Sequence, residues 1–190
     1  KIFNRSTLSK LFTEKYSDIL NMKSGGYCIW KFDIIEQMLN LVQENDIIIY
    51  IDSGLSINNK HIFKEYIDMV NNSDYGILSM QLSDSIERTT TTNELFKIRG
   101  ISSNSVIATT GQYLSNILVF KKCEHVTNII KECFKTINKD KYIITNKYDD
   151  NQPNSFHSNN YDQTILSIIR KQLGSIVINI NQEKYNDGII

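Results

Sequence analysis

The feature that most constrains the fold is a run of large apolar residues that ends in an aspartate and a glycine turn. Residues 45–54 read Asn-Asp-Ile-Ile-Ile-Tyr-Ile-Asp-Ser-Gly. Such a run of mostly β-branched residues is typical of a strand that is covered on both faces, as in an open α/β sheet. Ligands of these sheets bind beyond the carboxyl ends of the strands. Asp52, at the end of this strand, is therefore the first candidate for a functional residue.

Asp-Ser-Gly is also good turn chemistry, because an aspartate side chain can accept hydrogen bonds from nearby backbone N–H groups. The residues that follow favour a functional interpretation. Residues 61–70 have the spacing of an amphipathic helix, and residues 75–80 form a second strand candidate. Strand, polar loop, helix and strand together make a βαβ unit. We therefore predict an α/β fold with an open, mixed and mostly parallel sheet that is flanked by helices.

Composition narrows the class of protein. The 190 residues suit one domain, with 41% hydrophobic and 22% charged residues. The net charge is zero and the charges are scattered, so a nucleic-acid partner is not expected. No apolar stretch is long enough to span a bilayer. The three cysteines form no Cys-x-x-Cys pair, which favours reduced thiols in a cytoplasmic, reducing compartment.

Hydrophobic periodicity predicts the remaining elements. The first segment, residues 8–20, has helical spacing. The chain begins without an initiating methionine, which suggests a fragment of a longer chain. A polar, aperiodic loop is expected at residues 146–160. Helices are predicted at residues 33–43, 93–99 (with Thr92 as N-cap), 125–138 and 161–173, and strands at residues 113–120 and 176–180.

Several polar residues lie at the predicted ends of helices and strands. Each has an ordinary structural explanation: Lys31 as a solvated charge, Glu87 as a surface residue and Asp162 as a first-turn carboxylate favoured by the helix dipole. Trp30 would then be a core aromatic residue. These explanations compete with the functional ones that follow.

Three segments together resemble the sugar-nucleotide-dependent glycosyltransferases of the GT-A fold. Residues 25–31, Gly-Gly-Tyr-Cys-Ile-Trp-Lys, resemble a Gly-Gly-Tyr-Trp-x-Trp-Lys-Pro signature, and residues 49–54 resemble a strand-Asp-Ala-Gly segment related to the Asp-x-Asp motif. His157 and residues 161–167, Tyr-Asp-Gln-Thr-Ile-Leu-Ser, resemble a His…Asp-Gln-Ser-x-x-Ser block. The resemblance covers about residues 18–173 and implies one Rossmann-like GT-A domain over residues 1–190.

The resemblance implies a transferase that moves a sugar from a nucleotide donor to a hydroxyl group of a glycan, protein or lipid-linked acceptor. A divalent cation, Mn²⁺ or Mg²⁺, would neutralise the departing pyrophosphate. By matching, Asp52 and His157 would hold the metal ion. The expected donor-binding residues are Lys31, Asp52, Ser53, Gly54, Asn116 and Gln163.

Two carboxylates remain open as the catalytic base of an inverting reaction. Asp162 is implied by its place in the third segment, whereas Glu87 opens a polar loop before Thr91 and Thr92. Lys31 could counter phosphate charge. The sequence does not choose between the two carboxylates.

The chain also departs from the family pattern. Gly54 stands where the Asp-x-Asp motif has its second carboxylate, Cys28 and Phe32 replace an aromatic residue and a proline, and the chain begins after the usual first strand and helix. A catalytically silent carbohydrate-binding or assembly module on the same fold is therefore the alternative. A sugar nucleotidyltransferase is a third possibility, but the glycine-rich phosphate loop that it needs is absent from the sequence.

Overall fold

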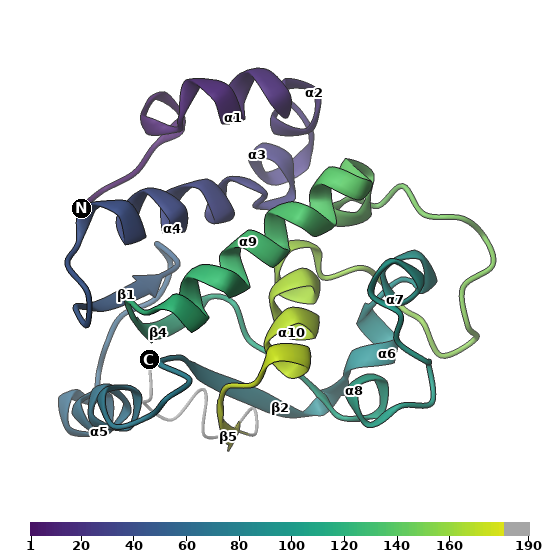
Figure 1. Cartoon of the computed structure of the whole chain (residues 1–190). Coiled ribbons are helices and arrows are strands. Elements are labelled where there is room, and N and C mark those ends of the chain that lie inside the picture. The colour runs from purple at the N-terminus through teal and green to yellow at the C-terminus, as the bar shows by residue number, and fades with distance from the viewer. Residues whose placement is uncertain (181–190) are drawn as a thin grey trace.

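The structure is a computed structural model that describes residues 1–180 and shows a mixed α/β protein (Figure 1). The strands are β1 (Ile47–Ile51), β2 (Leu78–Ile86), β3 (Gly111–Tyr113), β4 (Ile117–Lys121) and β5 (Ile176–Ile180). The helical segments are α1 (Lys10–Lys15), α2 (Ser17–Leu20), α3 (Lys23–Tyr27), α4 (Trp30–Leu41), α5 (Lys60–Asn71), α6 (Glu87–Thr90), α7 (Asn93–Arg99), α8 (Val106–Thr109), α9 (Glu124–Lys139) and α10 (Tyr161–Leu173), with 3-10 turns at Arg5–Thr7 and Lys141–Ile144.

The strands pair in mixed directions. β1 is antiparallel to β4, whereas β2 is antiparallel to β3 and parallel to β5. An antiparallel bridge between Ile77 and Phe120 joins the two groups of strands. β3 and β4 therefore follow one another along the same edge of β2. The mixed α/β class is confirmed, but the expectation of a mostly parallel sheet is wrong, because the β3–β4 stretch runs against both β1 and β2.

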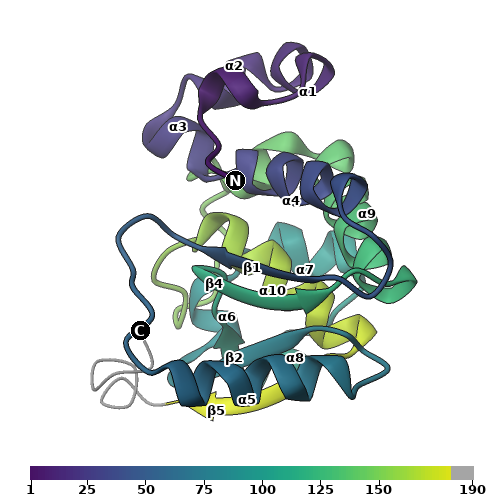
Figure 2. The same ribbon diagram turned by 90° about the vertical axis from the view of Figure 1, so that its left-hand side faces the viewer.

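Helices cover both faces of the sheet, and the alternation of side chains along β4 shows why. Leu118 and Phe120 point into a large core shared with α4, α9 and α10, while Ile117 and Val119 point into a smaller core shared with α5. Figure 2 shows α4 and α9 on one side of β1 and β4, and α5 on the other. A strand with apolar residues on both faces is thereby buried on both faces.

Most predicted helices and strands are present, but β2 begins three residues later and ends six residues later than the strand predicted at residues 75–80. The bounds of α7, α10 and β5 are those predicted from the sequence, and the side chain of Thr92 caps α7 by accepting a hydrogen bond from Leu95 N–H. The predicted strand at residues 113–120 is interrupted between β3 and β4. The first helical segment breaks at Tyr16, whose φ/ψ of −112°/22° lies outside the helical region.

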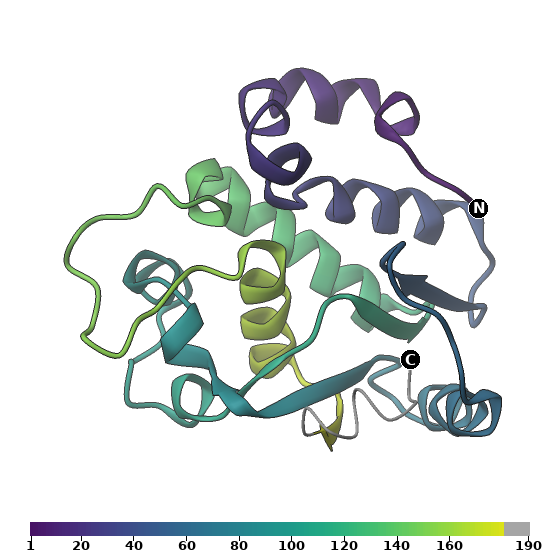
Figure 3. The ribbon, with the colours of Figure 1, turned by 180° about the vertical axis from the view of Figure 1, so that it is seen from behind.

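The polar loop before α10 is ordered by α7. Gln152 donates to the carboxylate of Glu94 at 2.9 Å and accepts from Asn93 N–H at 2.9 Å. Figure 3 shows the loop leaving α9, passing α7 and returning to α10. His157, near the end of this loop, donates its backbone N–H to the carbonyl of Thr89 at 2.8 Å.

Residues 24–28 form a left-handed turn, although they overlap the segment labelled α3. Their φ angles are 54°, 63°, 92°, 54° and 61°. Left-handed backbone costs about 1–2 kcal/mol for each residue with a side chain, so such a run needs support from its surroundings. The turn ends at Cys28, and α4 begins two residues later. This places Lys31 in the first turn of α4, not ahead of the helix as the sequence suggested.

Among residues 1–180, every helix is too short or too polar to span a lipid bilayer.

We predict that Gly26→Ala destabilises the protein by at least about 2 kcal/mol. A Cβ atom at this φ of 92° would lie 2.9 Å from the carbonyl oxygen of Ile19 and 2.9 Å from the Cα atom of Leu20, and both neighbours are backbone. Gly54→Ala is the matched control, since its Cβ would meet nothing within 4 Å and should change stability by less than about 0.5 kcal/mol. Urea denaturation measures both, and equal losses would contradict the account of the left-handed turn.

Candidate functional site

Three charged side chains from distant parts of the chain meet beyond the end of β1. Lys31 extends from the first turn of α4, Asp52 follows β1, and Asp162 lies in the first turn of α10. The ammonium nitrogen of Lys31 lies 2.6 Å from Asp162 Oδ2 and 3.6 Å from Asp52 Oδ1. We call the group of Lys31, Tyr50, Asp52, Ser115 and Asp162 the ammonium site.

The ammonium group of Lys31 is enclosed by the protein. It donates to the carbonyl oxygen of Ser115 at 3.0 Å, and the hydroxyl of Ser115 donates to Asp162 Oδ2 at 2.8 Å. The ammonium nitrogen also lies 4.9 Å from the centre of the Tyr50 ring, which is a cation–π contact. The Lys31 side chain is 2% exposed and that of Asp162 is 7% exposed. Lys31 and Asp162 therefore form a buried ion pair.

Asp52 is the accessible carboxylate of this site. Its side chain is 42% exposed, and the hydroxyl of Tyr50 donates to its Oδ1 atom. The backbone holds it from both sides: Asp52 N–H donates to the carbonyl of Asn116, and Leu55 N–H donates to the carbonyl of Asp52. The carboxylate is thus held in place and still open to solvent.

Burial sets the proton affinities at the site. It raises the pKa of Asp162, and the negative charge of Asp52 adds to the rise while Lys31 opposes it. Burial also raises the pKa of Tyr50, as do the hydrogen bond to Asp52 and its charge. The phenol of Tyr50 therefore keeps its proton and remains a hydrogen-bond donor to Asp52.

A cavity of about 730 Å³ lies beside Asp52. Apolar side chains from the N-terminal segment, α4 and β1 make most of its wall, and Asp52, Ser53 and Cys28 also line it. The other lining residues are Lys1, Ile2, Phe3, Asn4, Arg5, Leu8, Leu20, Gly25, Trp30, Ile34, Ile35, Met38, Ile48, Ile49, Tyr50 and Ile51. A mostly apolar cavity of this size that also has polar lining groups is typical of a small-molecule site.

Ser53 and Gly54 are exposed in the turn that follows Asp52. The φ angle of Gly54 lies outside the left-handed region, and a Cβ atom there would meet nothing within 4 Å. This backbone therefore does not require glycine at the position where the Asp-x-Asp motif has its second carboxylate.

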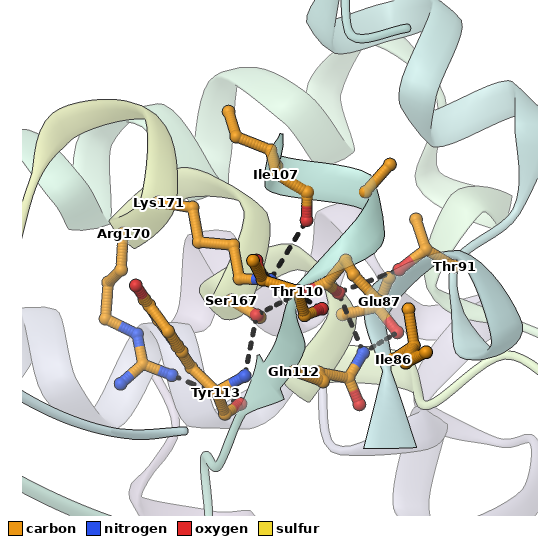
Figure 4. Close-up of polar contacts among 12 residues, drawn as sticks. Ile86, Glu87, Thr91, Ile107, Thr110, Gln112, Tyr113, Ser167, Arg170 and Lys171 are labelled. Atoms are coloured by element: carbon orange, nitrogen blue, oxygen red, sulfur yellow. Dashed lines mark hydrogen bonds and ion pairs between the residues drawn. The ribbon is translucent and has the colours of Figure 1, made fainter. Parts of the chain in front are cut away.

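Glu87 has no exposed surface and lies in a second polar cluster (Figure 4). Lys171 lies 3.0 Å from its Oε2 atom, and the Ser167 hydroxyl donates to the same oxygen at 2.5 Å. Thr91 and Gln112 each donate to Oε1 at 2.9 Å. We call these five residues the Glu87 cluster. The interpretation of Glu87 as a surface residue is wrong, and a role as catalytic base would require access that this conformation does not give.

Hydrogen bonds connect the Glu87 cluster to the ammonium site. Gln112 Oε1 accepts from the side-chain amides of Asn160 and Gln163 at 2.8 and 2.7 Å. Gln163 Oε1 in turn accepts from the backbone N–H of Ser115 at 3.2 Å. The first turn of α10 is therefore fixed to the stretch between β3 and β4. Ser115 is drawn toward α10 and Lys31, and this interrupts the strand that the sequence predicted as continuous.

Arg170 also contacts the stretch between β3 and β4. Its guanidinium is fully buried and donates to the carbonyl of Leu114 at 2.7 Å and to the hydroxyl of Ser79 at 3.1 Å. It also lies 5.5 Å from the centre of the Tyr113 ring. Burial lowers the pKa of Arg170 to about 10, which leaves the group cationic at neutral pH.

The two residues expected to hold a divalent ion, Asp52 and His157, lie in different surroundings. His157 is exposed in the loop before α10. Asp52 Oδ1 accepts from Tyr50 and faces the ammonium of Lys31. Within residues 1–180, no three His, Cys, Asp or Glu side chains form a group that could hold a metal ion.

Sequence reasoning brought together Lys31, Asp52, Asn116, Asp162 and Gln163, which all lie at or next to the ammonium site. It gave no role to the side chains of Tyr50 and Ser115. The alternation of β1 offered one signal for Tyr50, because residues 50 and 52 lie on the same face of a strand. The contact of Ser115 with Lys31 joins residues 84 positions apart, and no local pattern indicates it.

Comparison with known protein families, curated proteins and solved structures finds no match to this chain.

We predict strong coupling between Lys31 and Asp162. Lys31→Met and Asp162→Asn should each lower the free energy of unfolding by about 3–5 kcal/mol, because each leaves a buried charge without its closest partner. The double variant should lose less than the sum of the two by at least about 1 kcal/mol. Urea denaturation measures this cycle, with exposed Asp68→Asn on α5 as a control that should change little. Additive losses would show that the two charges do not pair.

We predict that Cys28 reacts slowly with iodoacetamide although it lines the cavity. Burial, with the charge of Asp162 adding, raises the pKa of Cys28 from 9.0 to about 11, so at pH 8 its thiolate fraction falls about a hundredfold. Alkylation at Cys28, followed by mass spectrometry, should be slower by that factor in the native protein than in urea. It should rise with pH up to about 11. Equal rates in native protein and urea would contradict the burial of this thiol.

Proposed function

We propose that the protein is a glycosyltransferase that takes a sugar from a nucleotide donor bound beside Asp52. One observation carries the proposal. Each of the three segments that resemble the GT-A enzymes contributes one charged residue, Lys31, Asp52 or Asp162, and the three side chains meet beyond one strand end. The carboxyl end of a strand is the usual ligand position in an α/β sheet.

Asp52 is the residue that we assign to the ligand. A fixed and accessible carboxylate accepts hydrogen bonds from hydroxyl groups, which are abundant on the ribose and the sugar of a nucleotide donor. The adjacent cavity, with Trp30 and Tyr50 in its wall, offers apolar surface for a nucleobase. Ser53 lines the same cavity and adds one hydroxyl.

Asp52 is also the best-placed candidate base for the acceptor hydroxyl. A base must come within hydrogen-bond reach of the proton that it accepts. Asp162 is occupied by Lys31 and Ser115, and Glu87 is enclosed by its cluster. We therefore assign Asp162 to holding Lys31 and Glu87 to holding Gln112, which fixes the first turn of α10.

A carbohydrate-binding module without transferase activity is the second candidate. The formal charge of Lys31, Asp52 and Asp162 together is −1, from one ammonium and two carboxylates. A net negative site favours neutral sugar hydroxyls over a pyrophosphate group. Gly54 adds no further ligand to this turn.

Thermal unfolding with a panel of ligands separates the two candidates. The panel contains nucleoside diphosphates, their sugar conjugates and free sugars, each with Mn²⁺ or with EDTA. A ligand at a hundred times its Kd stabilises by about 2.7 kcal/mol, which raises the Tm by about 5–10 °C for a chain of this length. Stabilisation by a nucleotide sugar, followed by its consumption with an acceptor, supports the transferase. Stabilisation by free sugars alone supports the module, and no stabilisation by any ligand contradicts both.

We predict that Asp52→Asn weakens binding of the stabilising ligand by about 10–100-fold while the protein stays folded. The variant replaces a charged acceptor, and hydrogen bonds to charged groups contribute about 1.5–3 kcal/mol. Asp68→Asn, which replaces an exposed aspartate of α5, is the matched control. This variant should bind the ligand with the affinity of the unchanged protein. Equal affinities in the Asp52 variant and the control would remove Asp52 from the site.

A further inference from the structure

We infer that Lys31 is the resident cation of this site: its ammonium fills the position between Asp52 and Asp162, so Asp52 receives sugar hydroxyls and not a protein-bound divalent ion. The inference concerns the site of the proposed function and specifies how it recognises the donor. It departs from the Asp-x-Asp pattern, in which the strand-end carboxylates serve a metal ion.

The contacts of the ammonium account for its three N–H donors. Asp162 Oδ2 at 2.6 Å and the Ser115 carbonyl at 3.0 Å are the two closest acceptors, and the Ser115 hydroxyl follows at 3.3 Å. Asp52 Oδ1 lies 3.6 Å away and supplies a second negative charge. A buried ammonium is stable only when it is paired and hydrogen-bonded in this way. Lys31 therefore stays between the carboxylates.

The same geometry leaves no room for a divalent ion between the carboxylates. Mg²⁺ needs oxygen ligands at about 2.0–2.1 Å and nearly octahedral geometry. An ion that ligated Asp162 Oδ2 would lie next to the ammonium, which bonds to that same oxygen at 2.6 Å. Two cations this close repel each other strongly in a site with little water. Asp52 Oδ1 is also occupied, by the hydroxyl of Tyr50.

Lys31 acts on the ligand through Asp52. The Tyr50 hydroxyl orients the Asp52 carboxylate by its hydrogen bond, and the Lys31 ammonium, 3.6 Å from Asp52 Oδ1, balances part of its charge. The exposed part of the Asp52 side chain faces solvent beside the cavity. Lys31 is thus a positioning residue. A carboxylate held in this way is ready to accept hydrogen bonds from a sugar diol without an ordering cost at the moment of binding.

Mn²⁺ alone tests the inference, with free Mn²⁺ measured by electron paramagnetic resonance. We expect the unchanged protein to bind no stoichiometric Mn²⁺ and to unfold at the same temperature in Mn²⁺ and in EDTA. One bound Mn²⁺ per chain that disappears in Asp52→Asn would overturn the inference.

The inference also predicts that Mn²⁺ binds to the Lys31→Ala variant. Without the ammonium, the two carboxylates face an empty position, and we expect Mn²⁺ to bind at least about tenfold more tightly than to the unchanged protein. The gain should vanish in Lys31→Ala/Asp162→Asn. Lys122→Ala is the matched control, since this lysine donates to the Val42 carbonyl and has no carboxylate partner among residues 1–180.

A folding defect in Lys31→Ala would not stop the test. If this variant is unfolded in EDTA, Mn²⁺ should restore a cooperative unfolding transition, because metal binding is linked to folding. A variant that shows neither Mn²⁺ binding nor rescue would overturn the inference. The Mn²⁺ measurement uses no nucleotide, so its result does not depend on the proposed function. If no nucleotide stabilised the protein, the proposed function would be contradicted, but the conclusion that Lys31 excludes a divalent ion would still be tested.

Discussion

The buried ion pair of Lys31 and Asp162 is the interaction on which the rest of the structure around the site depends. It joins α4 to α10 across the end of the sheet, and Ser115 completes it from the stretch between β3 and β4. Each of these elements brings one polar group that is costly to bury alone. Together they satisfy one another, which fixes the three elements in one arrangement.

Asp52 is the solvent-exposed residue of this arrangement. The Tyr50 hydroxyl donates a hydrogen bond to its carboxylate, the Lys31 ammonium lies 3.6 Å from it, and Asp52 lines the cavity described above. Behind the first turn of α10, the Glu87 cluster reaches the same residues through Gln112 and Gln163. The polar interior is therefore connected by hydrogen bonds and ion pairs to the surroundings of one accessible carboxylate.

Local patterns were sufficient for the elements with strong periodicity. Thr92 and the apolar spacing after it indicated α7, and the stripe of α10 was equally clear. What the sequence did not reveal is tertiary in origin. The break between β3 and β4 follows from the contacts of Ser115 with α10 and Lys31, and Glu87 is buried only because partners from distant segments surround it. Charged residues are mostly exposed in proteins, so burial of Lys31 and Glu87 ran against the general expectation.

Nitrogen-15 NMR of the Lys31 ammonium tests most directly whether this buried cation organises the site. A buried ammonium that bonds to Asp162 and Ser115 should give a resolved N–H₃⁺ signal at neutral pH that exchanges slowly with water, and Asp162→Asn should shift it. The signal can be assigned by its loss in Lys31→Met. An ammonium that exchanges as rapidly as those of exposed lysines, or one that Asp162→Asn leaves unchanged, would contradict the account.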